Sequence, residues 1–207
     1  MNLKRSVRRV AAIAGVALLL ASACGGDDDD AAPAQEAVEV APVQIDGPPL
    51  GPLGDSGDPA LGQPVPGLAG TATDGTPLAW TPGERPAAIV FLAHWCPACQ
   101  AEVAELVDWL EAGNELPEGV DFLSVVTLVD SERGNYPPSR WLADEGWPIP
   151  ALVDSESNEI AAAMGQAGTP FWVFVNGDGT LATRGSSRLP PEVLTEFFDQ
   201  LLAAGQG

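Results

Sequence analysis

The sequence predicts an α/β fold in which helices flank a mixed central sheet and a β-hairpin precedes that sheet. Two uninterrupted apolar runs of strand length, residues 87 to 93 and 120 to 129, are typical of buried central strands. Each run is followed by a segment with helical features, and a second hairpin over 171 to 185 precedes an amphipathic C-terminal segment. Strands that alternate with helices and end in a hairpin favour a sheet with both parallel and antiparallel pairs.

The individual elements follow from local patterns. A hairpin is predicted over 68 to 80, with an Asp-Gly turn at 74 to 75. A helix is predicted over 97 to 113, because apolar residues recur on one face and Gly113 lies just past its end. The other predicted elements are strands at 87–93, 120–129, 149–154, 171–176 and 180–185, and helices at 139–146, 157–165 and 190–204.

The first 24 residues have the three parts of an export signal. A basic start is followed by an uncharged apolar stretch from Val10 to Ala23, which is too short to span a bilayer comfortably as a helix. A retained membrane anchor is the alternative. The letters LASAC, which end at Cys24, resemble the lipobox of bacterial lipoproteins, in which the cysteine is acylated and becomes the new N-terminus. We therefore expect residues 1–23 to be a signal peptide and Cys24 to be a lipid anchor on the extracytoplasmic face of the bacterial cell membrane.

A tether is expected to follow this anchor. From residue 24 to residue 60 the chain is dense in Gly, Pro and Asp and shows no hydrophobic period. Such a composition cannot offset the entropy cost of ordering, so the segment is predicted to be disordered. Residues 61–207 are then the folded domain. Arg8 and Arg9 form a twin-arginine pair in a poor context, which leaves Sec and Tat export open.

Net charge excludes one large class of partner. The chain has a formal charge of −20, and its four cations before residue 10 lie in the predicted signal peptide. The remainder carries five Arg, no Lys and 29 acidic residues, a formal charge of −24. A surface of this sign repels phosphate backbones and anionic lipid headgroups. We therefore expect no nucleic-acid partner, and contact with the membrane only through the lipid anchor.

Cys96 and Cys99 form the candidate active site. If Cys24 is acylated, they are the only other thiols of the chain, in a compartment where disulfides persist. A buried strand runs into a helix that begins at Pro97, and Pro is favoured at the first helical position. Cys96 then lies at the N-cap, where free backbone N–H groups and the helix dipole lower a thiol pKa. This pattern predicts that Cys96 exchanges with a substrate sulfur and that Cys99, one turn along, resolves the mixed disulfide.

Two other interpretations of the cysteine pair are weaker. A structural zinc site needs about four ligands, and the single His of the chain, His94, is too close to the pair to complete a tetrahedron easily. A structural disulfide across so short a loop gains little from closure. We expect neither a metal nor an organic cofactor, because electrons travel by thiol exchange.

At this point the sequence resembles the thioredoxin-fold proteins, and among them the extracytoplasmic TlpA/ResA-like thiol-disulfide oxidoreductases, with some likeness to the secreted DsbE/DsbF-type proteins. The resemblance covers residues 61 to 204. Its motifs are LGQPVPGLAGTATDGTPL, FLAHWCPAC, a glutamate three residues after the second cysteine, GTP at 168 to 170, and FWVFVNGDGTL.

The resemblance implies roles for further residues. Pro170 matches a residue that family members hold as a cis-proline opposite the disulfide, and Thr169 offers its backbone to a substrate thiol in the mixed disulfide. Trp95 matches the aromatic residue beside the attacking cysteine. Glu102 matches an acid that some members keep near the active site; without the resemblance it is a solvated helix residue.

Two departures from the wider family matter. Val90 stands where thioredoxins proper carry a buried Asp, so a proton from Cys99 must pass to Glu102, to water or to the substrate. The dipeptide at 97 to 98 is Pro-Ala, which resembles oxidising Cys-Pro-X-Cys sites. His94 could add positive charge near the attacking thiol, but a lone His in this place is more often a partly exposed side chain.

We therefore expect an extracytoplasmic thiol-disulfide oxidoreductase that exchanges disulfides with exported proteins, acts as an oxidase, and is recycled by a membrane redox partner. The TlpA/ResA likeness supports the alternative, a reductase in cytochrome c maturation. Less favoured classes are a thiol peroxidase, a Sco-like copper protein, which needs CxxxC and a distant His, and a redox-inactive binding module. The sequence does not determine the substrate, the recycling partner or the oligomeric state.

Overall fold

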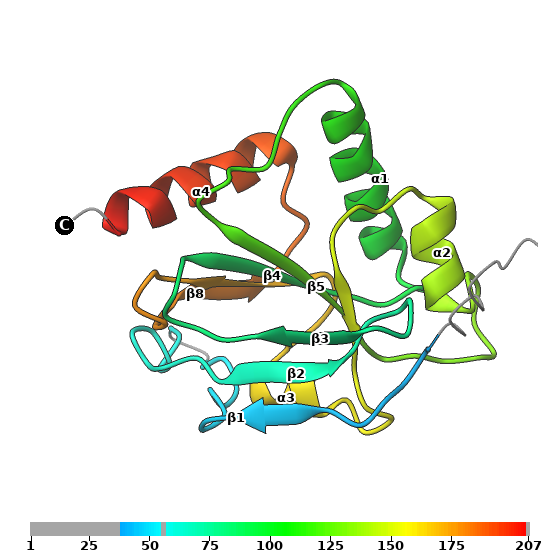
Figure 1. Cartoon of the computed structure of the whole chain (residues 1–207), viewed down its shortest axis with the longest axis horizontal. Coiled ribbons are helices and arrows are strands. Elements are labelled where there is room, and N and C mark those ends of the chain that lie inside the picture. The colour runs from blue at the N-terminus through cyan, green and yellow to red at the C-terminus, as the bar shows by residue number, and fades with distance from the viewer. Residues whose placement is uncertain (1–37, 55–56, 206–207) are drawn as a thin grey trace, which may run out of the picture. The chain divides into compact units, whose positions relative to one another are not determined.

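The computed structural model describes residues 38–54 and 57–205, which form a central five-stranded sheet, a smaller three-stranded sheet and four helices (Figure 1). The strands are β1 (Gln44–Asp46), β2 (Gly67–Thr71), β3 (Pro77–Trp80), β4 (Ala87–Leu92), β5 (Asp121–Val126), β6 (Ala151–Val153), β7 (Phe171–Val175) and β8 (Leu181–Ser186). The helices are α1 (Pro97–Glu111), α2 (Pro138–Asp144), α3 (Glu159–Ala163) and α4 (Pro191–Ala204). Every strand and helix predicted from residue 68 onward is present.

The central sheet is mixed, as predicted. Its strand order is β6-β5-β4-β7-β8, and β4, β5 and β6 run parallel to one another. The strands β7 and β8 form the late hairpin, and β7 pairs antiparallel with β4. The C-terminal end of β4 and the N-terminal end of β7 therefore lie side by side at the same end of the strands, where the register pairs Phe91 with Phe171.

Two hydrophobic cores lie on the two faces of the central sheet. Because side chains alternate along a strand, Val90 of β4 belongs to the core under α1, α2 and α4, whereas Ile89 and Phe91 belong to the other core. The second core is covered by α3 and by residues of β2 and β3 (Figure 1). All six residues of β4 are buried, which explains its unbroken apolar sequence.

The N-terminal boundary of the folded domain was predicted too late. The expectation that residues 24 to 60 form a disordered tether is wrong for 38–54 and 57–60, because β1 pairs with β2 and Leu50 is buried in the second core. In addition, the Asp58 carboxylate accepts hydrogen bonds from the buried Arg184 guanidinium at 2.8 Å. The ordering contacts come from parts of the chain that are distant in sequence, so local composition does not reveal them.

The predicted signal peptide (1–23), the lipidation site Cys24 and the first part of the tether lie outside the described residues. Among the residues that the structure describes, no helix is both long enough and apolar enough to cross a membrane.

Candidate active site

Cys96 lies at the N-cap of α1, where the sequence placed it. The strand β4 ends at Leu92, and Cys96 adopts an extended backbone (φ −81°, ψ 117°) immediately before Pro97 opens the helix. The Cys96 carbonyl accepts the first helical hydrogen bond, from the N–H of Gln100 at 3.0 Å. The residue is 7% exposed, so only its edge faces solvent.

The surroundings of Cys96 favour its thiolate. Burial by itself raises the pKa of this thiol, but hydrogen bonds from the Thr169 side chain and from the backbone N–H groups of Cys99 and Ala98 outweigh burial and lower the pKa below its usual value. The N–H groups of Ala98 and Cys99 belong to the first turn of α1. They supply the stabilisation that a helix N-terminus is expected to give an anion.

Cys99 is the inner thiol and has the opposite character. It is fully buried, one turn into α1, and its sulfur lies 3.5 Å from the N–H of Ala93. Burial in apolar surroundings raises the pKa of Cys99 to about 12. The pair therefore consists of one thiol that ionises readily and one that needs a proton acceptor before it can react.

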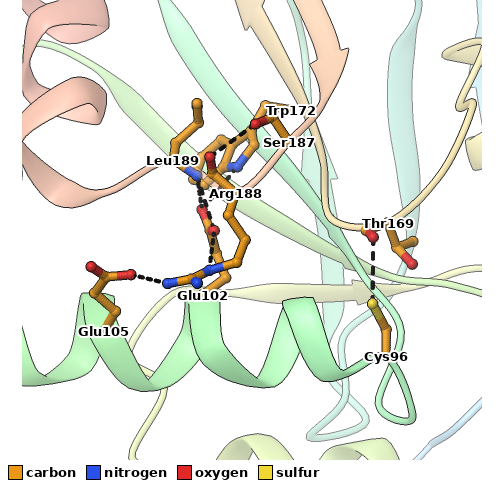
Figure 2. A network of polar contacts seen from close by, with 8 residues as sticks. All are labelled: Cys96, Glu102, Glu105, Thr169, Trp172, Ser187, Arg188 and Leu189. Carbon is orange, nitrogen blue, oxygen red and sulfur yellow. Dashed lines mark hydrogen bonds and ion pairs between the residues drawn. The ribbon is translucent and has the colours of Figure 1, made fainter.

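Thr169 and Pro170 lie beside Cys96, although more than seventy residues separate them in the chain. The Thr169–Pro170 peptide bond is cis, as the resemblance implied. The Cys96 thiol donates a hydrogen bond to the Thr169 carbonyl, with sulfur and oxygen 3.4 Å apart (Figure 2). This contact follows from topology. The antiparallel pairing of β7 with β4 brings the residues before Phe171 to the end of β4 that leads into α1.

Glu102 is buried, and the alternative of a solvated helix residue is wrong. It is 3% exposed, on the same side of α1 as Cys99. Its carboxylate accepts hydrogen bonds from the Trp172 indole N–H at 3.0 Å and from the Leu189 backbone N–H at 3.0 and 3.1 Å (Figure 2). Burial nevertheless dominates and raises the pKa of Glu102 from 4.5 to about 7.

Val90, which the resemblance aligns with the buried Asp of thioredoxins proper, is fully buried. It pairs across the sheet with Trp172 and lies in the same core as Cys99. A carboxyl group is nevertheless close to this core, because Glu102 reaches it from α1 and bonds to Trp172. The acid thus comes from the helix instead of from the strand.

The Trp95 side chain is held in place next to Cys96. Its indole N–H donates to the Leu128 carbonyl at 2.8 Å, and the guanidinium of Arg133 lies over the ring, 4.0 Å from its centroid. A cation over an indole face is favourable. Both contacts come from the connection between β5 and α2, so this connection fixes the residue that precedes Cys96.

Comparison with known proteins was made with this geometry established. The model of a protein family named Redoxin matches residues 59–198, well over half of the chain. The chain belongs to the Redoxin family. Membership makes it an oxidoreductase, and it confirms the resemblance that the motifs around Cys96 and Pro170 indicated.

Solved structures similar to this Redoxin-family chain show the same thioredoxin-like fold. One is a secreted Mycobacterium tuberculosis disulfide oxidoreductase homologous to E. coli DsbE, with 23% identity over 65% of this chain and 94% of that one, and a TM-score of 0.50. Another is DsbF from MTB, with 22% identity over 64% and 93% of the two chains and a TM-score of 0.51. A third is StoA from Bacillus subtilis, with 15% identity over 62% and 92% and a TM-score of 0.51.

His94 differs from expectation in this Redoxin-family chain. It is fully buried, not partly exposed. Its Nδ1 lies 2.7 Å from the Gly134 carbonyl and its Nε2 lies 3.2 Å from the Asp130 N–H. The carbonyl can only accept and the N–H can only donate, so the ring is a neutral imidazole with one N–H. His94 therefore holds the loop after β5 and does not supply positive charge to Cys96.

Sequence reasoning missed Arg133, Arg188 and the backbone of Leu189. Arg188 contacts Glu102 and Arg133 contacts Trp95, so each arginine lies in direct contact with a predicted site residue. One signal was available, because only five Arg follow the predicted signal peptide and a cation is rare in so acidic a chain. Within 38–54 and 57–205, no group of three His, Cys, Asp or Glu side chains is arranged to hold a metal ion.

Proposed function

We propose that this protein is a thiol-disulfide oxidoreductase that exchanges disulfides with exported proteins through Cys96 and Cys99, and that it acts as an oxidant. The main observation in support is that the two thiols have opposite pKa shifts. The pKa of Cys96 is lowered at the N-cap of α1, whereas burial raises the pKa of Cys99 to about 12. One sulfur is thus suited to exchange with a partner and the other to resolve the product.

The proposed oxidation proceeds in two exchanges. A client thiolate attacks Cys96 of the Cys96–Cys99 disulfide, which forms a mixed disulfide and releases Cys99 as a thiolate that takes up a proton. A second client thiolate then attacks the client sulfur of the mixed disulfide. This step forms the client disulfide and releases Cys96 as a thiolate, so the client loses the two electrons that the pair gains.

The position of Thr169 and Pro170 supports a docking role. The Thr169 carbonyl lies 3.4 Å from the sulfur that would join the client, and this places its backbone beside the mixed disulfide. Trp95 borders the same sulfur in sequence and is fixed by Leu128 and Arg133. We propose that these residues shape the groove into which a client segment docks.

Glu102 is the proposed proton partner of Cys99. It lies one turn further along the same side of α1, and residues three apart on a helix are neighbours. Its pKa of about 7 lets it both give and take a proton near neutral pH. Val90 offers no such group, so Glu102 is the acid through which the buried thiol exchanges its proton.

The lean towards oxidation rests on Cys96. Stabilising the thiolate stabilises the reduced pair relative to the disulfide, and this makes the disulfide a stronger oxidant. The buried Glu102 favours the alternative, a TlpA/ResA-type reductase in cytochrome c maturation, because the resemblance links such an acid to those proteins. In either direction we propose a lipid anchor at Cys24, an extracytoplasmic site, and a membrane redox partner that recycles the pair.

A trapping experiment tests the exchange reaction. Cys99→Ser, reduced and mixed with a disulfide-bonded protein, is expected to accumulate a mixed disulfide through Cys96, because the resolving thiol is gone. The wild type is expected to form this species only transiently, because Cys99 resolves it, and Cys96→Ser is expected to form none. Failure of Cys99→Ser to form a mixed disulfide would contradict the proposed function.

The reduction potential of the pair tests the direction. The Cys96/Cys99 couple is titrated in glutathione buffers in a chain that carries Cys24→Ser, so that only two thiols remain. A value near about −120 to −180 mV supports the oxidant, and a value near or below about −270 mV supports the reductase.

A further inference from the structure

Arg188 is the charged residue of the β8–α4 connection that faces the buried Glu102 carboxylate (Figure 2). The hydrogen bonds that Glu102 accepts come from neutral groups, the Trp172 indole on β7 and the Leu189 backbone. Arg188 adds the charge, with its Nε 3.9 Å from Glu102 Oε2. Among the described residues, no other cation forms an ion pair with Glu102.

Arg188 does not serve Glu102 alone. Its guanidinium also bonds to the carboxylate of Glu105, three residues further along α1 (Figure 2). The positive charge of Arg188 lowers the pKa of Glu102 and the negative charge of Glu105 raises it. Cys99, on the same helix, is the remaining titratable group on this side of Glu102. The carboxylate therefore lies between one favourable and one unfavourable charge.

We propose that Arg188 is a positioning residue that favours the ionised form of Glu102, and thereby sets the pH range in which Cys99 can give up its proton. Arg188 touches neither cysteine in the contacts of the described residues, so it acts through Glu102. The inference rests on the proposed function, because it assigns a regulator to the proton partner of the resolving thiol. Glu105 opposes this effect, because its negative charge lies near Glu102 and its carboxylate pairs with the same guanidinium.

The role is confined to one step of the reaction that re-oxidises the reduced pair, the reverse of the client oxidation described above. When the reduced pair meets a disulfide, the Cys96 thiolate attacks one sulfur and releases the other as a thiolate. Cys99 must then lose its proton to Glu102 and attack the Cys96 sulfur, which forms the Cys96–Cys99 disulfide and releases the second thiolate. An ionised Glu102 is needed only for this second step, so loss of Arg188 is expected to slow resolution and to leave the first attack unchanged.

The test follows both steps with glutathione disulfide as the probe. The reduced full chain, carrying Cys24→Ser and purified in detergent, is mixed with excess glutathione disulfide between pH 5 and pH 9. Samples are quenched in acid and analysed by mass spectrometry, which separates the reduced chain, the glutathione adduct and the internal disulfide. The rate of adduct formation reports Cys96, and the rate of adduct decay reports Cys99.

In the wild type, adduct decay is expected to rise with pH through a midpoint near the Glu102 pKa of about 7. An opposite charge within about 4–6 Å lowers a carboxyl pKa by about 1–3, and the 43% exposure of the Arg188 side chain weakens this effect. Arg188→Gln is therefore expected to move the midpoint up by about one pH unit. Decay then slows about tenfold at pH 6 and is unchanged at pH 9.

Two further variants separate charge from structure. Glu105→Gln removes the negative charge that raises the pKa of Glu102. The midpoint of adduct decay in this variant is therefore expected to move down, opposite to Arg188→Gln. Arg188→Lys is expected to restore most of the wild-type profile because it keeps the charge. Arg85→Gln is the matched control, since Arg85 forms an exposed ion pair with Asp121 at the start of β5, the end of the sheet away from Cys96; its profile is expected to match the wild type.

The outcomes distinguish the two proposals. If adduct decay has the same pH midpoint in Arg188→Gln as in the wild type, the role of Arg188 is overturned. The exchange function stays intact in that case, because the adduct still forms and decays. Slowing by the same factor at every pH also overturns the role of Arg188, because that result indicates a structural role. If the wild type forms neither the glutathione adduct nor the internal disulfide, the proposed function is overturned, and the role of Arg188 with it.

Discussion

The buried Glu102 makes the stability of the fold depend on pH in a way that one substitution can isolate. Burial raises the pKa of this carboxyl from 4.5 to about 7 in the folded state, whereas in the unfolded chain it titrates normally. Between these values the folded state holds a proton that the unfolded state has lost. The contribution of Glu102 to the free energy of unfolding is therefore largest below about pH 4.5 and falls as pH rises through about 7.

The size of this effect follows from the shift. One pKa unit corresponds to about 1.4 kcal/mol, so the change from 4.5 to about 7 corresponds to about 3 kcal/mol of stability lost between low and high pH. Glu102→Gln removes the ionisation. Gln keeps the volume of the side chain and an oxygen that can accept from Trp172 and Leu189, so the variant is expected to be more stable than the wild type at pH 8.

Urea unfolding of both reduced proteins, followed by tryptophan fluorescence at several pH values, measures the difference. Other carboxylates of this acidic chain also titrate, but they contribute equally to both proteins and cancel. Glu111→Gln, an exposed position on the same helix, controls for the loss of one negative charge. Wild-type and Glu102→Gln stabilities that change in parallel from pH 4.5 to pH 8 would refute the reasoning.

Three further results are expected. Iodoacetamide at pH 7 should modify Cys96 and spare Cys99, because the pKa of Cys96 is lowered while burial raises that of Cys99 to about 12; equal labelling, read by peptide mass spectrometry, would contradict the asymmetry. Arg184→Met leaves Asp58 without its buried partner and should lower the free energy of unfolding in urea by about 3–5 kcal/mol, whereas a loss below about 1 kcal/mol would mean that the pair matters little. His94→Ala removes the acceptor of the Asp130 N–H, so hydrogen exchange at that amide should accelerate by about five- to tenfold; an unchanged rate would show that His94 does not hold the loop.

The prediction of secondary structure succeeded from residue 68 onward because its signals are local. The unbroken apolar run of β4 reflects burial on both faces, and the Pro at the start of α1 marks the helix N-terminus. The prediction that the segment before residue 61 is disordered failed because its order depends on contacts that are distant in sequence. Its order depends on β2, on the second core and on Arg184, which lies 126 residues from Asp58.

The same division holds inside the active site. The position of Cys96 at the N-cap depends on a few consecutive residues, so the pattern around the CxxC motif was sufficient to predict it. His94 was misjudged because its burial depends on the loop from Asp130 to Asn135, whose path no local pattern reveals. Glu102 could be singled out only through the family resemblance, and its burial could not be predicted from local sequence.

The sequence by itself determined the fold class, the order of its elements and the position of Cys96 at a helix N-terminus, since these follow from hydrophobic periodicity and from the residues that favour the start of a helix. Only the tertiary structure decided which groups surround the second thiol. The carboxylate of Glu102 meets Leu189, 87 residues away, at a place where water is excluded. Burial and long-range charge pairs set a pKa, and both exist only after distant segments have packed together.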